Sequence, residues 1–262
     1  MTLDQDLIRQ LAERLENAEL NARAVTKITD AHPQLDWDDA YAIQHEIRRR
    51  KEARGHRVAG LKAGLTSRAK MKQMGVETPV FGLLFDYMSV ANGGEIKVSQ
   101  LIHPKVEAEI AFVLKTALRG PGCHVGAVLA ATDFVVPAVE IIDSRYENFR
   151  FDLASVIADN TSSSRFVVGD IAREVAGMDL RTLGIVMEKN GAIAALAAGA
   201  AVLGHPAAAV AMLANTLAKR GEEIPAGTFI MSGGATEAIP VAAGDAIHVR
   251  FQDLGSVSMR FV

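Results

Sequence analysis

The chain has 262 residues, of which 49% are hydrophobic and 23% are charged. Its 28 Lys and Arg residues and 31 Asp and Glu residues give a formal net charge of −3 at pH 7, without the basic excess typical of nucleic-acid binding. The single cysteine, Cys123, excludes an internal disulfide and any site built from several thiolates. The first twenty residues are charged throughout and lack the apolar core of a signal peptide, so we expect a cytoplasmic protein.

The N-terminal part of the sequence predicts amphipathic helices. Apolar residues recur at helical spacing within the first twenty residues, and a second helix is expected over residues 36–54, burying Trp37. The basic run at residues 48–51 is interpreted as a solvated helix face, with a phosphate-binding patch as the alternative. We therefore assign residues 1–75 to a helical N-terminal part.

From residue 57 onward, short apolar or alternating runs rich in β-branched residues predict strands separated by glycine and proline turns. The Asn190-Gly191 pair predicts a hairpin turn, and residues 246–251 and 256–261 predict a final strand pair. Helices are expected near residues 124–131 and 206–220. The fold class is therefore α+β, with residues 76–262 as a strand-rich body; the alternative is one continuous domain.

One segment is apolar enough to resemble a membrane span. Residues 191–218 contain no charged side chain and are long enough to cross a bilayer. Glycines and Pro206 interrupt the segment, however, and proline is well placed there to begin a new helix. We interpret the segment as a buried strand region followed by a core helix, and expect no membrane partner.

Two glutamates lie two residues apart in a predicted strand. Glu107 and Glu109 would point to the same side of that strand, roughly 6.5–7 Å apart. Neighbouring carboxylates repel each other unless a cation or a shared proton separates them. A solvated face and a metal site are both open for this pair.

A third glutamate favours the metal site. Glu140 lies in an almost wholly apolar segment, the pattern of a strand covered on both faces, where an unpaired carboxylate is costly. Three carboxylates suit Mg²⁺ or Mn²⁺, whereas no His or Cys spacing supports zinc. Asp143 and Arg145 follow closely and could surround the site or form a surface ion pair.

Other polar residues are candidates for binding or catalysis. Lys62 shares a strand face with Gly60 and Gly64, which leave room beside it; it could meet a substrate carboxylate or act as an acid–base group, or extend into solvent. The hydroxyl cluster at residues 160–164 either binds anions or satisfies a turn. The glycines within residues 232–236 permit close approach of the backbone to a ligand.

Several segments, in order, carry a family resemblance: GLKAGLTS, MGVETPVFGLLFDYM, HPKVEAEIAFVL, VVPAVEIIDSRYENF, ADNTSSSRF and IPAGTFIMSGG. Through them the sequence resembles, nearly from end to end, the hydratase/decarboxylase branch of the fumarylacetoacetate hydrolase superfamily. The H-P-x-V-E-A-E element followed by V-E-x-x-D-S-R is specific for this branch. The resemblance implies a mixed β-sheet roll or barrel with a helical N-terminal part.

The resemblance also implies roles for individual residues. Three glutamates would hold Mg²⁺ or Mn²⁺, namely Glu107, Glu109 and Glu140. Lys62 and Glu77 would be catalytic, with Glu77 on a segment that closes over the site. Ser162 and Ser163 would bind a substrate carboxylate.

The activity that the resemblance implies is that of a carboxy-lyase of aromatic meta-cleavage degradation. It would convert 2-oxo-3-hexenedioate (4-oxalocrotonate) to 2-hydroxypenta-2,4-dienoate and CO₂. The alternative is hydration of 2-hydroxypentadienoate (2-oxopent-4-enoate), and a third hypothesis is a non-catalytic partner that stabilises a related enzyme. A small 2-oxo dicarboxylate substrate, a homo-oligomer and a complex with the pathway hydratase are expected.

Overall fold

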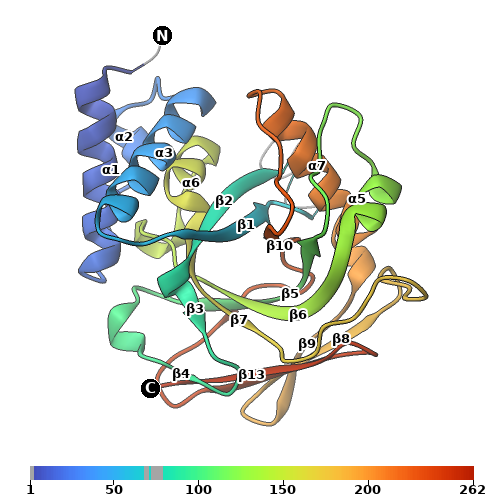
Figure 1. The fold of residues 1–262 in the computed structure, drawn as a ribbon. Helices are drawn as coiled ribbons and strands as arrows, with labels where there is room; N and C mark the ends of the chain where they lie inside the picture. Colours follow the sequence, from blue (N-terminus) through green and yellow to red (C-terminus); the bar gives the residue numbers. More distant parts are fainter. Residues whose placement is uncertain (1–2, 68–70, 72–78) are drawn as a thin grey trace.

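The computed structural model describes residues 3–67, 71 and 79–262. Figure 1 shows two curled sheets with helices on their outside: the N-terminal helices and the helix at residues 153–158 cover one flank, and the helices at residues 125–131 and 206–218 cover another. The expected α+β class and curled mixed sheet are confirmed.

Three helices open the chain: α1 (Gln5–Leu20), α2 (Ile28–Ala31) and α3 (Trp37–Ala53). The two long predicted helices are confirmed. Asp36 caps α3, because its carboxylate accepts a hydrogen bond from the Asp39 N–H at 3.0 Å. The predicted burial of Trp37 is wrong: Trp37 is the first residue of α3 and is 37% exposed, whereas Tyr41, one turn later, lies on the buried face.

The basic run at residues 48–51 ties α3 to α1. Arg50 forms an ion pair with the buried Glu16 of α1, at 2.6 Å. Lys51 is itself buried, and its Nζ lies 2.7 Å from Oε2 of Glu19. The predicted solvated face is therefore wrong for Lys51, because acids of the neighbouring helix compensate the buried charge.

The larger sheet contains eight strands of the described chain. Its order is β2 (Val80–Phe85), β1 (Val58–Gly64), β10 (Phe229–Met231), β5 (Lys105–Leu114), β6 (Thr132–Ile142), β7 (Ser163–Val168) and β3 (Ser89–Val90), with β11 (Ile239–Pro240) also paired to β5. The β1–β10 and β3–β7 pairs are parallel, and the other pairs are antiparallel. Strand β1 lies within residues 1–75, and that division of the chain remains a proposal.

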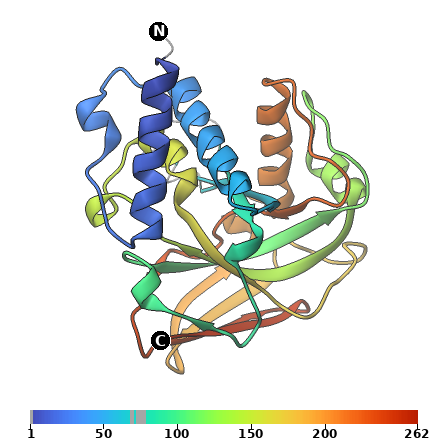
Figure 2. The ribbon, with the colours of Figure 1, turned by 60° about the vertical axis from the view of Figure 1, so that its left-hand side comes forward.

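The smaller sheet has the order β4 (Glu95–Ile96), β13 (Gly255–Phe261), β12 (Ala246–Phe251), β8 (Gly184–Lys189) and β9 (Ala192–Ala198). The predicted final strand pair is confirmed as β12 and β13. The predicted hairpin is also confirmed: Asn190 and Gly191 join β8 to β9 with φ of 55° and 80°, as a type I′ turn requires. Figure 2 shows this sheet below the helical layer.

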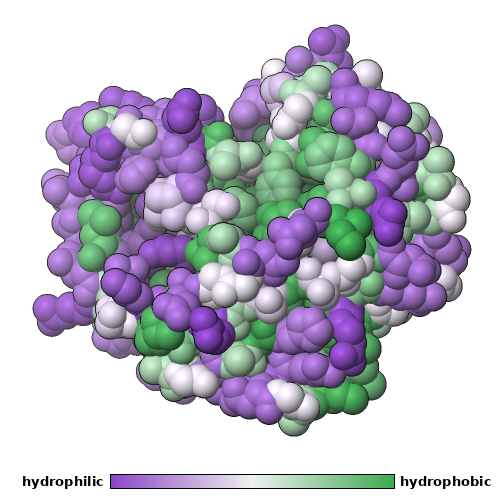
Figure 3. All heavy atoms as spheres, turned by 60° about the horizontal axis from the view of Figure 1, so that its bottom comes forward, coloured by the Kyte–Doolittle hydropathy of each residue, from purple (hydrophilic) through white to green (hydrophobic). Residues whose placement is uncertain are grey.

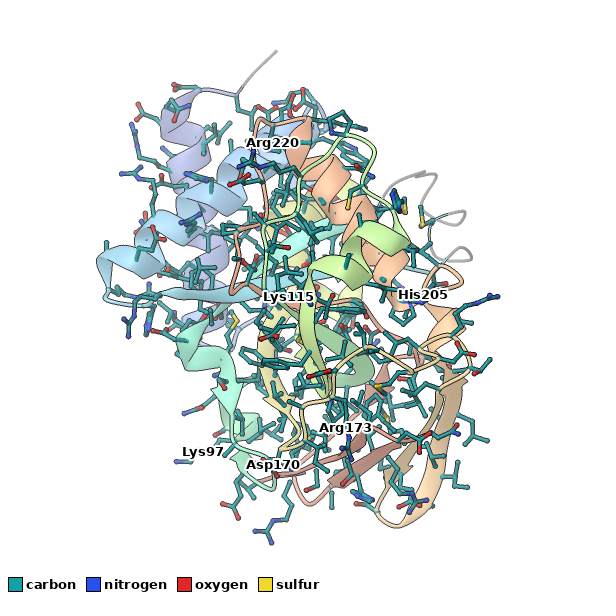
Figure 4. The ribbon with its side chains drawn as sticks, turned by 45° about the vertical axis from the view of Figure 1, so that its right-hand side comes forward. Lys97, Lys115, Asp170, Arg173, His205 and Arg220 are labelled. Atoms are coloured by element: carbon teal, nitrogen blue, oxygen red, sulfur yellow. The ribbon has the colours of Figure 1, made fainter. Side chains whose placement is uncertain are left out.

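The remaining helices are α5 (Val125–Ala131), α6 (Leu153–Ala158) and α7 (Pro206–Ala218), with short 3-10 turns η1 (Asp86–Met88), η2 (Val98–Gln100), η3 (Glu147–Phe149), η4 (Asn160–Ser162) and η5 (Gly199–Ala201). Helices α5 and α7 confirm the two helices expected in this half. The ring of His205 caps α7 by accepting a hydrogen bond from the Ala207 N–H at 3.0 Å. After α7, the guanidinium of Arg220 lies 4.8 Å from the ring centroid of Tyr41, which joins α7 to α3 (Figure 4).

The apolar segment is divided as the sequence indicates. By length and composition alone Gly199–Ala218 could cross a membrane, and half of this window is buried inside the protein. It consists of η5, a turn and α7, and it follows the strand β9. The core helix is thus confirmed. The predicted burial of the strand is wrong, because no residue of β9 is buried and Ile193 and Leu196 are 64% and 68% exposed. On the outside, Figure 3 shows one face on which hydrophobic residues are grouped among hydrophilic ones.

Candidate metal centre and its cavity

Three buried carboxylates meet on the β5–β6 pair. Glu107 stands directly opposite Glu140 in the antiparallel ladder, and Glu109 lies two residues further along β5. One carboxylate oxygen of each residue lies within 4.8 Å of one from each of the others. The solvated-face interpretation of Glu107 and Glu109 is wrong, because their exposed fractions are 7% and 0%.

Lys62 of β1 reaches this carboxylate cluster. Its Nζ lies 2.9 Å from Oε1 of Glu140 and donates a hydrogen bond to Oε2 at 3.1 Å. Lys62 is buried, so the alternative of a lysine extending into solvent is wrong. The adjacent glycines do not leave open space either: a Cβ at Gly60 would lie 2.5 Å from the carbonyl oxygen of Phe229, and one at Gly64 would lie 3.2 Å from Val80.

Burial dominates the electrostatics of the cluster. It raises the pKa of Glu109 well above its usual range, and the charge of Glu140 raises it further, while Lys62 and a backbone N–H oppose the shift. Burial also raises the pKa of Glu140, against the effect of Lys62. Among the described residues, three carboxylates and the Lys62 ammonium gather at this point, and carboxylate oxygens so close together can hold a divalent cation.

The glycines at residues 233 and 234 support the carboxylates. The Gly233 N–H donates a hydrogen bond to Oε2 of Glu109 at 2.7 Å, with the Gly233 φ at +99°. A Cβ at Gly234 would lie 2.6 Å from Oε2 of Glu107. From the sequence we expected these glycines to admit a ligand, whereas in the structure they admit two glutamate side chains.

The donor set fits a hard divalent cation. Within the described part of the chain, Oε1 of Glu109 is buried and has no hydrogen-bond partner, a costly arrangement for a carboxylate oxygen. Carboxylate oxygens are the ligands that Mg²⁺ and Mn²⁺ prefer. A cation among the three carboxylates would both occupy this oxygen and relieve their mutual repulsion.

A cavity of about 400 Å³ opens beside the cluster, a size typical of small-molecule sites. Lys62, Glu107 and Glu140 form its charged wall. Most of the remaining lining is apolar and comes from Ala63, Leu65, Val80, Ile142, Phe149, Phe151, Val156 and Ala238. The cavity therefore combines a charged wall with a long apolar wall.

The hydroxyl cluster only partly faces this cavity. Thr161 and Ser162 line it, whereas Ser163 is buried and does not. Residues 160–162 form a left-handed turn with φ of 49°, 52° and 60°, and the side chain of Asn160 bonds the N–H and C=O of Leu83 at 2.8 and 2.9 Å. The turn thus fixes two hydroxyl residues at the cavity and anchors itself to β2.

Asp143 and Arg145 belong to a buried network. Arg145 forms an ion pair with Asp159, and burial raises the pKa of Asp159 to about 6 against the effect of this guanidinium. The Asp143 carboxylate accepts hydrogen bonds from the N–H groups of Ile102 and His103 at 2.8 and 2.7 Å. The surface ion pair considered from the sequence is therefore wrong. Arg145 instead donates hydrogen bonds to the carbonyl oxygens of Asp159 and Ser163, the residues on either side of the turn.

Glu77, which the resemblance makes catalytic, lies outside the described residues. Lys105 lines the cavity, although the sequence analysis did not identify it as a site residue. The alternation of β5 could have revealed it, because Lys105 lies two residues before Glu107 and so shares its face.

No family model matches the chain. It is 64% identical over 261 residues to a 4-oxalocrotonate decarboxylase of Pseudomonas sp. (strain CF600), covering 100% of this chain and 99% of that protein. It is 40% identical over 260 residues to a 2-hydroxyhexa-2,4-dienoate hydratase of Comamonas testosteroni, covering 98% of each. A solved 4-oxalocrotonate decarboxylase from Pseudomonas putida G7, complexed with magnesium and adipate, is 62% identical, with a TM-score of 0.98 over 100% of this chain and 99% of that one.

Distant structures share the fold alone. A fumarylacetoacetate hydrolase family protein from Yersinia pestis has a TM-score of 0.58 at 13% identity, over 77% of this chain and 92% of that one. The curled mixed sheet is thus the fold seen in that superfamily. With relatives this similar over its whole length, the chain belongs to the family of 4-oxalocrotonate decarboxylases and related 2-oxo acid hydratases.

Proposed function

We propose that this chain is a Mg²⁺-dependent carboxy-lyase that converts 2-oxo-3-hexenedioate to 2-hydroxypenta-2,4-dienoate and CO₂. The observation that carries the proposal is the cluster of Glu107, Glu109 and Glu140 beside Lys62, at one end of a cavity for a small molecule. The relatives with identities above 60% are decarboxylases, one of them solved with magnesium and a six-carbon dicarboxylate, whereas the hydratase relative is 40% identical.

The three glutamates would hold the cation. When bound, Mg²⁺ supplies Lewis-acid stabilisation for the negative charge that develops on the 2-oxo oxygen of the substrate as CO₂ leaves. The ammonium of Lys62, at the same end of the cavity, adds positive charge near that oxygen and can hold or deliver a proton at Nζ. Lys62 is therefore proposed as catalytic, together with Glu77.

The hydroxyl turn would orient the substrate. Ser162 and the neighbouring Thr161 line the cavity. The Thr161 hydroxyl donates to the carbonyl oxygen of Asn160 at 2.8 Å and the Ser162 hydroxyl to Asp159 at 3.4 Å, so each would exchange that acceptor for the substrate carboxylate. Ser163, proposed alongside Ser162 from the resemblance, does not line the cavity, and its buried hydroxyl oxygen has no hydrogen-bond partner among the described residues.

The apolar wall would favour the loss of CO₂. Ile142, Phe149 and Phe151 contribute apolar surface to the cavity that the carboxylate cluster borders. A departing carboxylate in such surroundings becomes neutral CO₂ more readily than in bulk water. Hydration of a dienoate would instead need a positioned water in this region.

Side-by-side rates on two substrates test the proposal. Purified protein with Mg²⁺ receives either 2-oxo-3-hexenedioate, with CO₂ release as the readout, or 2-hydroxypentadienoate, with its loss of ultraviolet absorbance as the readout. We expect CO₂ release from the first and negligible turnover of the second. Hydration of the second substrate without decarboxylation of the first would assign the chain to the hydratases.

The choice of metal ion, the localisation and the assembly of the protein belong to the same proposal. We propose that Mn²⁺ can replace Mg²⁺, because both are hard cations that accept carboxylate ligands. The family resemblance further supports a cytoplasmic homo-oligomer that associates with the pathway hydratase. Light scattering of the chain alone and with the purified hydratase tests both assemblies, and a monomer in both samples would contradict them.

A further inference from the structure

A second lysine lines the cavity. Lys105 is the first residue of β5 and shares the face that carries Glu107. It stands opposite Ile142 of β6, two residues outward from the Glu107–Glu140 pair. Lys105 therefore marks the outer end of the cavity, while the carboxylate cluster marks the inner end.

The ammonium of Lys105 has no anionic partner among the described residues. It lies 4.1 Å from the ring centroid of Phe149, which also lines the cavity. Asp143, which follows the residue opposite Lys105 in the ladder, already accepts two backbone hydrogen bonds. By contrast Lys62, the other cavity lysine of the described chain, is paired with Glu140. A cavity cation that contacts an aromatic ring and has no anionic partner in the described part of the chain is suited to receive an anionic group of a ligand.

The strand sets the distance between the two ends. Two residues along a strand advance by roughly 6.5–7 Å, so the Lys105 and Glu107 positions are about this far apart. The two carboxylates of an extended six-carbon diacid have a similar separation. A ligand of this length with its 2-oxo acid end at the glutamates spans the rise of β5 from Glu107 to Lys105, so its far carboxylate can reach the Lys105 side chain.

We propose that Lys105 binds the far carboxylate of the substrate and makes the cavity selective for dicarboxylates over monocarboxylates of the same length. This specificity role rests on the proposed function, which places the 2-oxo acid end at the carboxylate cluster. The lysine contributes to binding of the ground state, because the far carboxylate loses its charge when it leaves as CO₂. Removal of Lys105 therefore raises KM and leaves kcat unchanged or higher.

Binding of two saturated analogues tests the role without turnover. Titration calorimetry with Mg²⁺-loaded protein compares 2-oxoadipate with 2-oxohexanoate, which carries a methyl group where the first has its far carboxylate. We expect wild type to bind 2-oxoadipate about tenfold more tightly, the effect of one charge-assisted hydrogen bond. Lys105→Met should abolish this preference without weakening 2-oxohexanoate, and Lys105→Arg should retain it.

Lys115→Met is the matched control, because Lys115 is an exposed lysine just beyond the opposite end of β5. It should bind both analogues as wild type does. Three results would overturn the role: no preference in wild type, a preference kept by Lys105→Met, or equal weakening of both analogues by that substitution. A protein that shows the preference but releases no CO₂ from 2-oxo-3-hexenedioate would refute the proposed function and leave the role of Lys105 intact.

Discussion

Glu107 of β5 faces Glu140 of β6 directly across an antiparallel ladder, with both side chains buried. Like charges in such a cross-strand pair destabilise a sheet, and burial adds to the cost. Lys62 forms an ion pair with Glu140, and Glu109 adds a third carboxylate beside them. Three buried carboxylates this close together lower the stability of the metal-free protein, and a bound cation would restore it.

Replacing one carboxylate of the cluster should have opposite effects on the stability of the metal-free protein and on its stabilisation by Mg²⁺. Glu109→Gln keeps an oxygen for the Gly233 N–H but removes a buried charge, so we expect the metal-free variant to melt at or above the wild-type temperature. Mg²⁺ at a hundredfold excess over its Kd should stabilise wild type by about 2.7 kcal/mol and leave the variant unaffected. Thermal unfolding with and without Mg²⁺ measures both effects. Glu95→Gln, an exposed control, should respond as wild type does; equal stabilisation of all three proteins would exclude Glu109 as a ligand.

Gly234 should matter through the space that it leaves for Glu107. A Cβ there would lie 2.6 Å from Oε2 of Glu107, so Gly234→Ala must displace the carboxylate. We expect Mg²⁺ affinity to fall about tenfold, within the range for changes beside metal ligands. Gly184→Ala is the control, because its Cβ would meet only a side-chain oxygen of Gln252, at 3.4 Å. Calorimetric Mg²⁺ titration compares them, and unchanged affinity in Gly234→Ala would refute the steric argument.

Lys62 should be required for turnover but not for folding. Lys62→Met keeps most of the side-chain volume and removes the ammonium near the 2-oxo end of the substrate, so we expect kcat to fall by about 10²–10⁴-fold. Far-ultraviolet circular dichroism should stay that of wild type. Lys97→Met, at an exposed lysine far along the chain (labelled in Figure 4), should keep full activity. A Lys62→Met enzyme within threefold of wild-type kcat would remove Lys62 from the mechanism.

The contact between α1 and α3 should make folding acid-sensitive. Burial would raise the pKa of Glu19, but the ion pair with Lys51 and the hydrogen bond from Tyr87 outweigh it and lower this pKa from 4.5 to about 2. Because the folded-state pKa is depressed, the stabilisation is complete above about pH 4.5 and is lost as the pH falls toward 2. The whole interval corresponds to about 3 kcal/mol.

Urea unfolding of wild type and Glu19→Gln at pH 6 and pH 3 measures this dependence. The stability difference between the two proteins should shrink by about 2 kcal/mol at the lower pH. Glu13→Gln, on the exposed side of α1, should differ little from wild type at either pH. A constant difference between wild type and Glu19→Gln would show that Glu19 does not titrate as proposed.

Local patterns in the sequence predicted much of this site. The period-two alternation placed Glu107 and Glu109 on one face, and the apolar surroundings of Glu140 indicated its burial. Pairing between distant segments could not be predicted in the same way, because the register that sets Glu107 opposite Glu140 depends on the whole sheet. The partner of Lys62 lies 78 residues away, and no local pattern reveals such a contact.

The errors have a similar physical origin. The run that includes Lys51 is basic enough to predict a solvated face, and only the packing of α1 against α3 supplies the acids that allow its burial. The Gly233-Gly234 pair indicated close approach of a ligand, but what approaches is a glutamate side chain from β5. The sequence therefore indicates that a position leaves space or carries charge. Only the packing of distant segments determines which residue fills that space or pairs with that charge.

The most direct test follows one carbon atom. The protein is given 2-oxo-3-hexenedioate with ¹³C in the far carboxylate, and NMR monitors the label with Mg²⁺ present and after chelation of all divalent cations. We predict that the label leaves as CO₂ and bicarbonate with Mg²⁺, that 2-hydroxypenta-2,4-dienoate accumulates in equal amount, and that chelation stops both. Retention of the label in the organic product, or release at the same rate after chelation, would contradict a metal-dependent decarboxylase.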